Sequence, residues 1–166
     1  MTSPYATIDG LMKTLYAAIS GPPGGQDWER DREIYHPDAL ITRTRIVDGL
    51  PVAFTFTFDE FVEATIPLLA GRSFYEIETD RVADIFGQIA HVYSVYEARE
   101  MPESTELEFR GVNMVHLWND GIVGADGVGV KGDGSPSRWW VMSIIWDNER
   151  EGLALPGSWG GKRVAD

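Results

Sequence analysis

The chain has 166 residues, with 14 Lys and Arg against 26 Asp and Glu, which gives a formal net charge of −12 at pH 7. A surface this acidic repels phosphate backbones and anionic lipid headgroups, so we expect no binding to nucleic acid or to a membrane. Cysteine is absent, which excludes disulfides, thiolate metal sites and a cysteine nucleophile. The length predicts a single domain over residues 1–166. Because we find no membrane span or secretory signal, we expect a soluble, cytoplasmic protein.

The first half of the chain predicts helices around a strand pair. Apolar residues at helical spacing predict a helix within residues 3–20, and a shorter helix is expected from Trp28 to Tyr35, with residues 29–33 on its polar face. Strands are expected at 40–46 and 52–56, joined by an Asp-Gly turn. The capping-box spacing of Thr57 and Glu60 then predicts a third helix that runs to about Ala70.

The second half predicts long strands, at residues 74–86, 89–101, 105–118 and 139–148. The Gly- and Asp-rich stretch 119–137 is too long for a simple turn and predicts an extended loop or a small flap. Helices followed by an antiparallel meander indicate an α+β domain. We therefore expect three N-terminal helices packed on one face of a curved, mainly antiparallel sheet of about six strands.

The pairing of the strands 89–101 and 105–118 follows from a two-residue turn at Glu103-Ser104, which makes paired residue numbers sum to 207. The more apolar face, which we expect to point toward the helices, then holds Ala90, Val92, Ser94, Tyr96 and Ala98 opposite Leu117, Val115, Asn113, Gly111 and Phe109. The outer face places His91 opposite His116 and predicts two charge pairs, Glu97 with Arg110 and Arg99 with Glu108.

Ser94 and Asn113 are polar among apolar neighbours and face each other in this register. Either they hydrogen-bond to one another as a satisfied buried pair, or they line a cavity. Further walls for a cavity would come from Tyr16, from Tyr96 and from one of two alternating sets in the last strand. These sets are Trp140, Met142, Ile144 and Trp146, or Trp139, Val141, Ser143 and Ile145.

The order of elements, together with three local motifs, resembles the NTF2-like superfamily, which includes the SnoaL-like and ketosteroid-isomerase-like proteins, and in particular an uncharacterised bacterial member. The motifs are Tyr35-His36-Pro37-Asp38-Ala39, Arg110-Gly111-Val112-Asn113, and Arg138-Trp139-Trp140-Val141 continuing through Trp146-Asp147. The resemblance implies a cystatin-like α+β cone. It also implies a pocket between the concave sheet and the first helices, and a homodimer formed through the outer sheet face.

For ketosteroid-isomerase-like members, the resemblance implies a Tyr from the first helix, an Asp base on the first strand and a donor on the third long strand. Tyr16 and Asn113 match the first and third positions and are our best candidates for catalysis. The base position falls on Arg43, and a guanidinium cannot abstract a proton. Arg43 would instead favour an anionic or carbonyl ligand, or it belongs to a solvated strand face.

The predicted ligand pocket therefore comprises Tyr16, Arg43, Ser94, Tyr96, Asn113, Met142 and Trp146. Three functions stay open: a small-molecule-binding protein, a dimerisation module without catalysis, or an isomerase, dehydratase or cyclase that performs acid–base chemistry on a carbonyl compound. The hypothesis of a small-molecule pocket fails if these side chains are packed solid without a cavity of about 300 Å³. An inward carboxylate near Asn113, such as Asp38, would favour the enzyme. Residues 127–132 spell G-x-G-x-x-G, but no helix is expected after them, so we predict no cofactor and no metal site.

Overall fold

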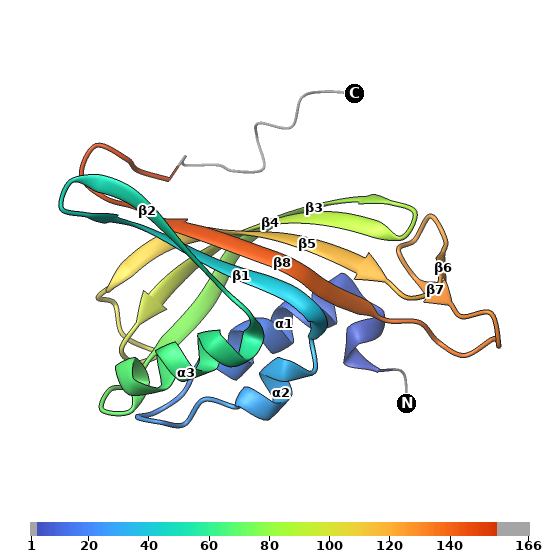
Figure 1. The fold of residues 1–166 in the computed structure, drawn as a ribbon, viewed down its shortest axis with the longest axis horizontal. Helices are drawn as coiled ribbons and strands as arrows, with labels where there is room; N and C mark the ends of the chain where they lie inside the picture. Colours follow the sequence, from blue (N-terminus) through green and yellow to red (C-terminus); the bar gives the residue numbers. More distant parts are fainter. Residues whose placement is uncertain (1–2, 156–166) are drawn as a thin grey trace.

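The computed structural model describes residues 3–155, which build a curved six-stranded sheet with the helices against one face (Figure 1). The strand order is β2-β1-β8-β5-β4-β3, and only the β1–β8 pair is parallel. The strands are β1 (Tyr35–Val47), β2 (Leu50–Phe56), β3 (Tyr75–Phe86), β4 (Ile89–Arg99), β5 (Phe109–Asn119) and β8 (Trp139–Asn148). The sheet is therefore mixed, and the expected α+β class with about six strands is confirmed.

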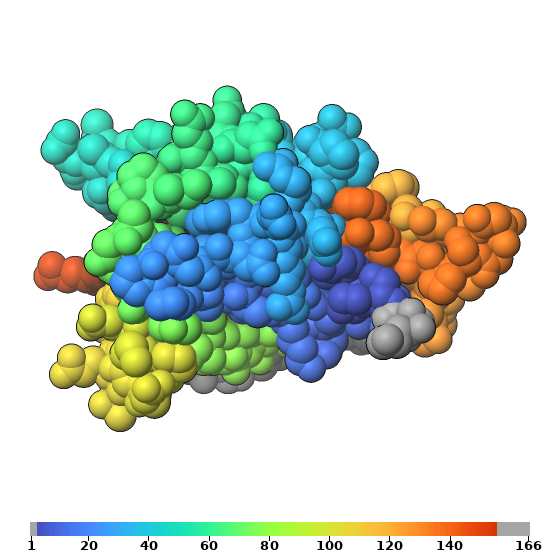
Figure 2. Space-filling view, turned by 90° about the horizontal axis from the view of Figure 1, so that it is seen from below, coloured from blue at the N-terminus to red at the C-terminus, as the bar shows by residue number. Residues whose placement is uncertain are grey.

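The helices are η1 (Pro4–Ala6), α1 (Ile8–Ile19), α2 (Trp28–Arg32) and α3 (Phe58–Leu69). Thr57 and Glu60 form the predicted capping box of α3. The first expected helix is divided, because Thr7 caps α1 after the short η1 turn. The expectation of three N-terminal helices is only partly met, since α2 has five residues and α3 follows the first two strands. Seen from the helix side, α2 and α3 lie beside one another over the sheet (Figure 2).

The predicted register between β4 and β5 is confirmed, from Ile89 opposite Trp118 to Ala98 opposite Phe109. The predicted inward face is also the buried one, with Val92, Ser94 and Val115 completely enclosed. The connection is longer than the expected two-residue turn. Glu97 stands opposite Arg110 as predicted, but Glu97 pairs with Arg99 and Arg110 pairs with Glu149. The predicted pair of Arg99 with Glu108 is wrong, because Glu108 precedes β5 and pairs with Arg72.

Two β-bulges decide which side chains face the helices. In β3 the pairing shifts between Glu78 and Asp80, so that Glu76 stands opposite Ala98. Without this shift the two-residue turn before β4 would place Ile77 there instead, and both glutamates would point outward.

The second bulge lies in β8, where His116 pairs with Ser143 but Leu117 pairs with Val141. Met142 is the extra residue. The inner face of β8 therefore combines half of each predicted set: Trp139, Val141, Ile144 and Trp146. A one-residue insertion reverses the alternation of every residue beyond it.

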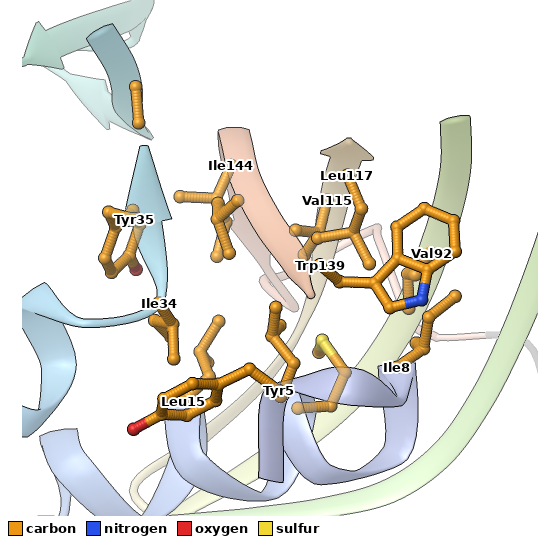
Figure 3. Packing of buried hydrophobic residues seen from close by; sticks show 14 of the residues in the cluster. Tyr5, Ile8, Leu15, Ile34, Tyr35, Val92, Val115, Leu117, Trp139 and Ile144 are labelled. Carbon is orange, nitrogen blue, oxygen red and sulfur yellow. The ribbon is translucent and has the colours of Figure 1, made fainter. Parts of the chain in front are cut away.

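The main core lies between α1 and the inner face of β4, β5 and β8. Figure 3 shows Ile8 and Leu15 of α1 on the helix side of Val115 and Leu117. The predicted flap is a small hairpin of β6 (Ile122–Val123) and β7 (Gly129–Val130), and the buried Trp139 indole donates a hydrogen bond to its Gly127 carbonyl, at 3.1 Å. Among the helices of residues 3–155, none is long and apolar enough to cross a membrane.

Candidate functional site

A small cavity of about 50 Å³ lies between the helix layer and the inner face of the sheet. It is lined by Leu15, Ile19, Asp31, Tyr35, Ile41, Phe61, Glu76, Asn113, Ile144 and Trp146. The place is the expected one, but the volume is far below the roughly 300 Å³ that we expected for a ligand pocket. A few water molecules, or the end of a small ligand, fill a space of this size.

Asp31 is the most unusual of the lining residues, because this acidic residue is only 2% exposed. It lies on α2 and makes no side-chain hydrogen bond to any other residue within 3–155. Burial, together with the negative charges of Glu76 and Asp27, raises the pKa of Asp31 to about 8. Asp31 therefore keeps its proton at neutral pH, where an ordinary Asp is ionised.

Glu76 reaches the same cavity from β3, where the bulge turns it inward. Some surface of the residue remains accessible, but protein encloses its carboxyl group, and this burial raises the pKa of Glu76 to about 8. The described part of the chain offers this carboxyl no hydrogen bond either. Because each negative charge disfavours the other, we expect the two carboxyls to lose their protons in two coupled steps.

Asn113 is one of two predicted site residues that line the cavity, and a series of hydrogen bonds fixes its amide. Its Nδ2 donates to the Tyr16 hydroxyl at 3.0 Å, and the Tyr16 hydroxyl lies 2.6 Å from Ser94 Oγ. Ser94 donates its only hydroxyl proton to Glu78 Oε1, so Tyr16 is the donor to Ser94. Ser94 and Asn113 are thus joined through Tyr16 instead of directly.

The same chain of contacts continues to the surface. Arg81 binds Glu78 through Nε at 3.1 Å and Asp9 through Nη2 at 3.0 Å, and Lys13 pairs with Asp9 at 2.8 Å. Burial raises the pKa of Glu78 despite the opposing effects of Ser94 and Arg81. The bulge in β3 therefore turns two glutamates inward with different surroundings. The Glu78 carboxylate has hydrogen-bond partners, whereas the Glu76 carboxyl has none among residues 3–155.

The aromatic part of the cavity wall comes from three elements. Phe61 of α3 meets Trp146 of β8 edge to face, with ring centroids 6.1 Å apart. Tyr35, at the start of β1, completes this wall, and burial followed by the charge of Asp31 raises the pKa of its hydroxyl well above the ordinary value. Tyr35 therefore stays neutral and can donate a hydrogen bond toward a ligand.

The remaining predicted pocket residues lie elsewhere. Tyr96 donates to Asn148 Oδ1 at 2.6 Å, its ring 6.4 Å from that of Tyr16. Arg43 shares the inner face of β1 with Ile41 but lies beyond the cavity, with its guanidinium 6.0 Å from the Phe54 ring.

Met142 is turned to the other face of the sheet by the bulge in β8 and lines a hollow with His91 and His116. Asp38, which we named as a possible inward carboxylate, is exposed. Of the seven predicted residues, therefore, Asn113 and Trp146 line the cavity, Tyr16 and Ser94 support Asn113, and Tyr96, Arg43 and Met142 lie outside it.

Sequence reasoning missed the two carboxyls. Asp31 was assigned to the polar face of α2, although its spacing from Trp28 and Tyr35, three and four residues away, matches a helical stripe that turns inward. Glu76 carries no comparable signal, because the strand pattern of β3 says nothing about where a bulge will reverse its faces.

The outer face of the sheet carries two larger hollows. One, of about 470 Å³, contains the His91 and His116 pair, whose ring centroids are 4.6 Å apart. The other, of about 740 Å³, lies between the outer face near Met114 and Ile145 and residues 153–155. Neither contains the carboxyl pair, so these two hollows and the acid–base groups are on opposite faces of the sheet.

Comparison with solved structures identifies the class of fold as that of bacterial NTF2-like α+β proteins, as the sequence resemblance suggested. No family model matches the sequence, and no curated protein matches it closely enough to indicate a relationship.

Three similar structures are informative. A protein of unknown function from Mycobacterium tuberculosis is 16% identical at a TM-score of 0.58, over 89% of this chain and 75% of its own. An NTF2-like protein of unknown function from Pseudomonas putida is 9% identical at 0.58, over 96% of this chain and 91% of its own. A protein from Streptomyces avermitilis, provisionally assigned as an NTF2-like dehydratase, is 13% identical at 0.55, over 88% and 96%. Identities this low establish the fold and leave the activity to the site.

Proposed function

We propose that the protein is an acid–base enzyme that acts on a small carbonyl compound in the cavity between the helices and the sheet. The observation that carries the proposal is the pair of enclosed carboxyls, Asp31 and Glu76, which line one cavity without hydrogen-bond partners among residues 3–155. A carboxyl with a pKa near the working pH is suited both to accept and to donate a proton. Asn113 and Tyr35 add neutral hydrogen-bond groups beside it.

The chemistry needs one carboxyl in each protonation state. The ionised carboxylate removes a proton from the carbon next to the carbonyl, and the protonated carboxyl donates to the carbonyl oxygen, so the product is the neutral enol and the pair has exchanged roles. Return of a proton to another carbon gives an isomer, and loss of a β-hydroxyl as water gives a dehydration product. Asn113 or Tyr35 would stabilise the charge that develops on oxygen.

The lining also supports a restriction on the substrate. The cavity walls include no Lys, Arg or His, and Arg43 lies outside them, so a small anion would meet two acidic groups and no cation. The anionic ligand that we considered for Arg43 is therefore disfavoured, and the small volume favours a compound of few heavy atoms.

Exchange of carbon-bound hydrogen tests this proposal without a known substrate. Hydroxyacetone is incubated with the protein in D₂O, and loss of its methylene proton signals is followed by NMR. We expect faster exchange than in buffer alone, and Asp31→Asn and Glu76→Gln should each reduce the enzymatic rate by about a hundredfold or more, as for removal of a general base. Asp38→Asn removes an exposed carboxyl and should leave the rate unchanged. Exchange at the buffer rate would contradict the proposal.

We also propose that two copies associate through the outer sheet face. Large apolar side chains are partly exposed there, among them Met114 at 37% and Ile145 at 42%, beside the hollow of about 740 Å³. Exposed apolar groups that gather on one face favour a protein partner, and a second copy presents the same face. A dimerisation module without catalysis would use the same face. The exchange experiment distinguishes that function from an enzyme, because only the enzyme should accelerate exchange.

A further inference from the structure

We propose that the cavity binds a small ligand that carries a protonated nitrogen. Either the carbonyl substrate itself contains an amino group, or a small ammonium compound occupies the site in place of the substrate. The inference rests on the proposed function, because both require that the cavity holds a ligand. It follows from three properties of the site: enclosed carboxyls without a counterion, aromatic walls, and a volume that suits an ammonium group.

The first property is the missing counterion. The neighbouring arginines do not line the cavity. Arg30 is exposed on α2, Arg32 pairs with Asp59, and Arg81 pairs with Asp9 and Glu78. The residues that line the cavity therefore place two acidic groups together and supply no cation. An acidic group that is enclosed without a partner is costly, and a cationic ligand relieves this cost by pairing with it.

The second property is the aromatic part of the cavity wall. Tyr35, Phe61 and Trp146 line the same small space. The faces of aromatic rings attract cations, and tryptophan does so most strongly. Carboxyls combined with aromatic rings favour an ammonium group over a neutral hydroxyl, which the rings do not attract in this way.

The third property is size and ligand type. A cavity of about 50 Å³ admits an ammonium group with one or two carbons. A metal ion is the other cation to consider, but residues 3–155 contain no group of three or more His, Asp or Glu side chains placed to hold one. The net charge of −12 attracts cations of either kind toward the protein.

A cation bound in this place must displace a proton from the carboxyl pair. Ethylammonium stays charged throughout the neutral range, so its binding at pH 7 should release a proton to the buffer. The affinity should accordingly rise by up to about tenfold per pH unit between pH 6 and 8. The affinity of a neutral ligand of the same size should not rise with pH in this way.

The experiment compares ethylammonium chloride with ethanol as its neutral counterpart and with sodium acetate as an anion, at equal ionic strength set with sodium chloride. Thermal stability, proton release to two amine-free buffers of different ionisation enthalpy, and inhibition of hydroxyacetone exchange are measured. We expect ethylammonium alone to raise the melting temperature, to release a proton and to inhibit. Asp31→Asn and Glu76→Gln should weaken each response, whereas Asp38→Asn and Glu63→Gln, which remove exposed carboxyls, should not.

The outcomes separate this inference from the proposed function. If hydroxyacetone exchanges but ethylammonium has no more effect than ethanol, the inference of an ammonium ligand is wrong, and the proposal of an acid–base site stands. If magnesium or calcium chloride reproduces the response of ethylammonium with similar affinity, the site prefers a metal and the amine is again wrong. If neither exchange nor binding is seen, both proposals fail.

Discussion

Asp31 of α2 and Glu76 of β3 line one small cavity although 45 positions separate them in the chain, and burial raises the pKa of each to about 8. Neither carboxyl group receives a hydrogen bond from another residue in the described range. Two such groups reduce the stability of the fold at neutral pH. Residues that are kept although they lower the stability of the fold are typical of catalytic sites.

The cost has a definite pH dependence. In the unfolded chain both carboxyls lose their protons near pH 4, whereas the folded protein holds them until about pH 8, so the folded state binds more protons across this interval. Stability conferred by these groups is fully present below pH 4 and falls as the pH rises toward 8, by up to about 1.4 kcal/mol per pH unit for each group.

Asp31→Asn should therefore flatten the decline of unfolding free energy between pH 4 and 8 and should make the variant more stable than the parent at pH 8. Urea unfolding at several pH values measures this difference. The exposed Asp38→Asn serves as the control and should reproduce the parent curve. A variant that is less stable than the parent at pH 8 would show that Asp31 has a stabilising partner.

Ser94→Ala should interrupt the series of hydrogen bonds that runs from Asn113 through Tyr16 and Ser94 to Glu78. It leaves the Tyr16 hydroxyl without its acceptor and Glu78 without one donor, and we expect a loss of about 1–3 kcal/mol in unfolding free energy. Ser143→Ala removes a hydroxyl that contacts His116 at an exposed position, where water replaces the contact, so a smaller loss is expected. Equal losses in the two variants would argue against a structural role for this series of hydrogen bonds.

The same series of hydrogen bonds should also affect the proposed activity, because it holds the Asn113 amide in place. If Asn113 stabilises charge on the substrate oxygen, Ser94→Ala should slow hydroxyacetone exchange at saturation more than it weakens binding of the ketone. A change confined to the Michaelis constant would instead assign Asn113 to binding.

His91 should titrate below its ordinary pKa, because burial and then the neighbouring His116 both lower the pKa of His91, against the effect of Asp84. The C2 proton signal in NMR reports this titration directly. His116→Gln removes the neighbouring positive charge and should raise the pKa of His91. If the value does not change, the two imidazoles do not interact in solution despite ring centroids 4.6 Å apart.

Ile145→Glu tests the association of two copies. It places a charge at an exposed position on the outer face, so it should convert a dimer to monomers in analytical ultracentrifugation while leaving the thermal stability of the monomer nearly unchanged. Ile66→Glu, an exposed apolar position on α3, is the matched control and should stay dimeric. A parent protein that sediments as a monomer at all concentrations would overturn the proposal.

Much of the fold followed from the sequence because local patterns decide it. A turn centred on Glu103-Ser104, combined with strand alternation, predicted the β4–β5 register, the inward face with Ser94 and Asn113, and the opposition of His91 and His116. The register holds although the connection is longer than that turn. Thr57 and Glu60 defined the start of α3 in the same local way.

The tertiary structure decided the site. Two bulges, at Thr79 in β3 and at Met142 in β8, reverse which residues face the helices, so Glu76 enters the cavity and Met142 leaves it. An insertion of one residue into a curved sheet depends on how the whole sheet packs against its helices, and no alternation of polar and apolar residues records it. Asp31 faces the cavity for a related reason, because packing of the short α2 against α1 determines which of its charged residues is enclosed.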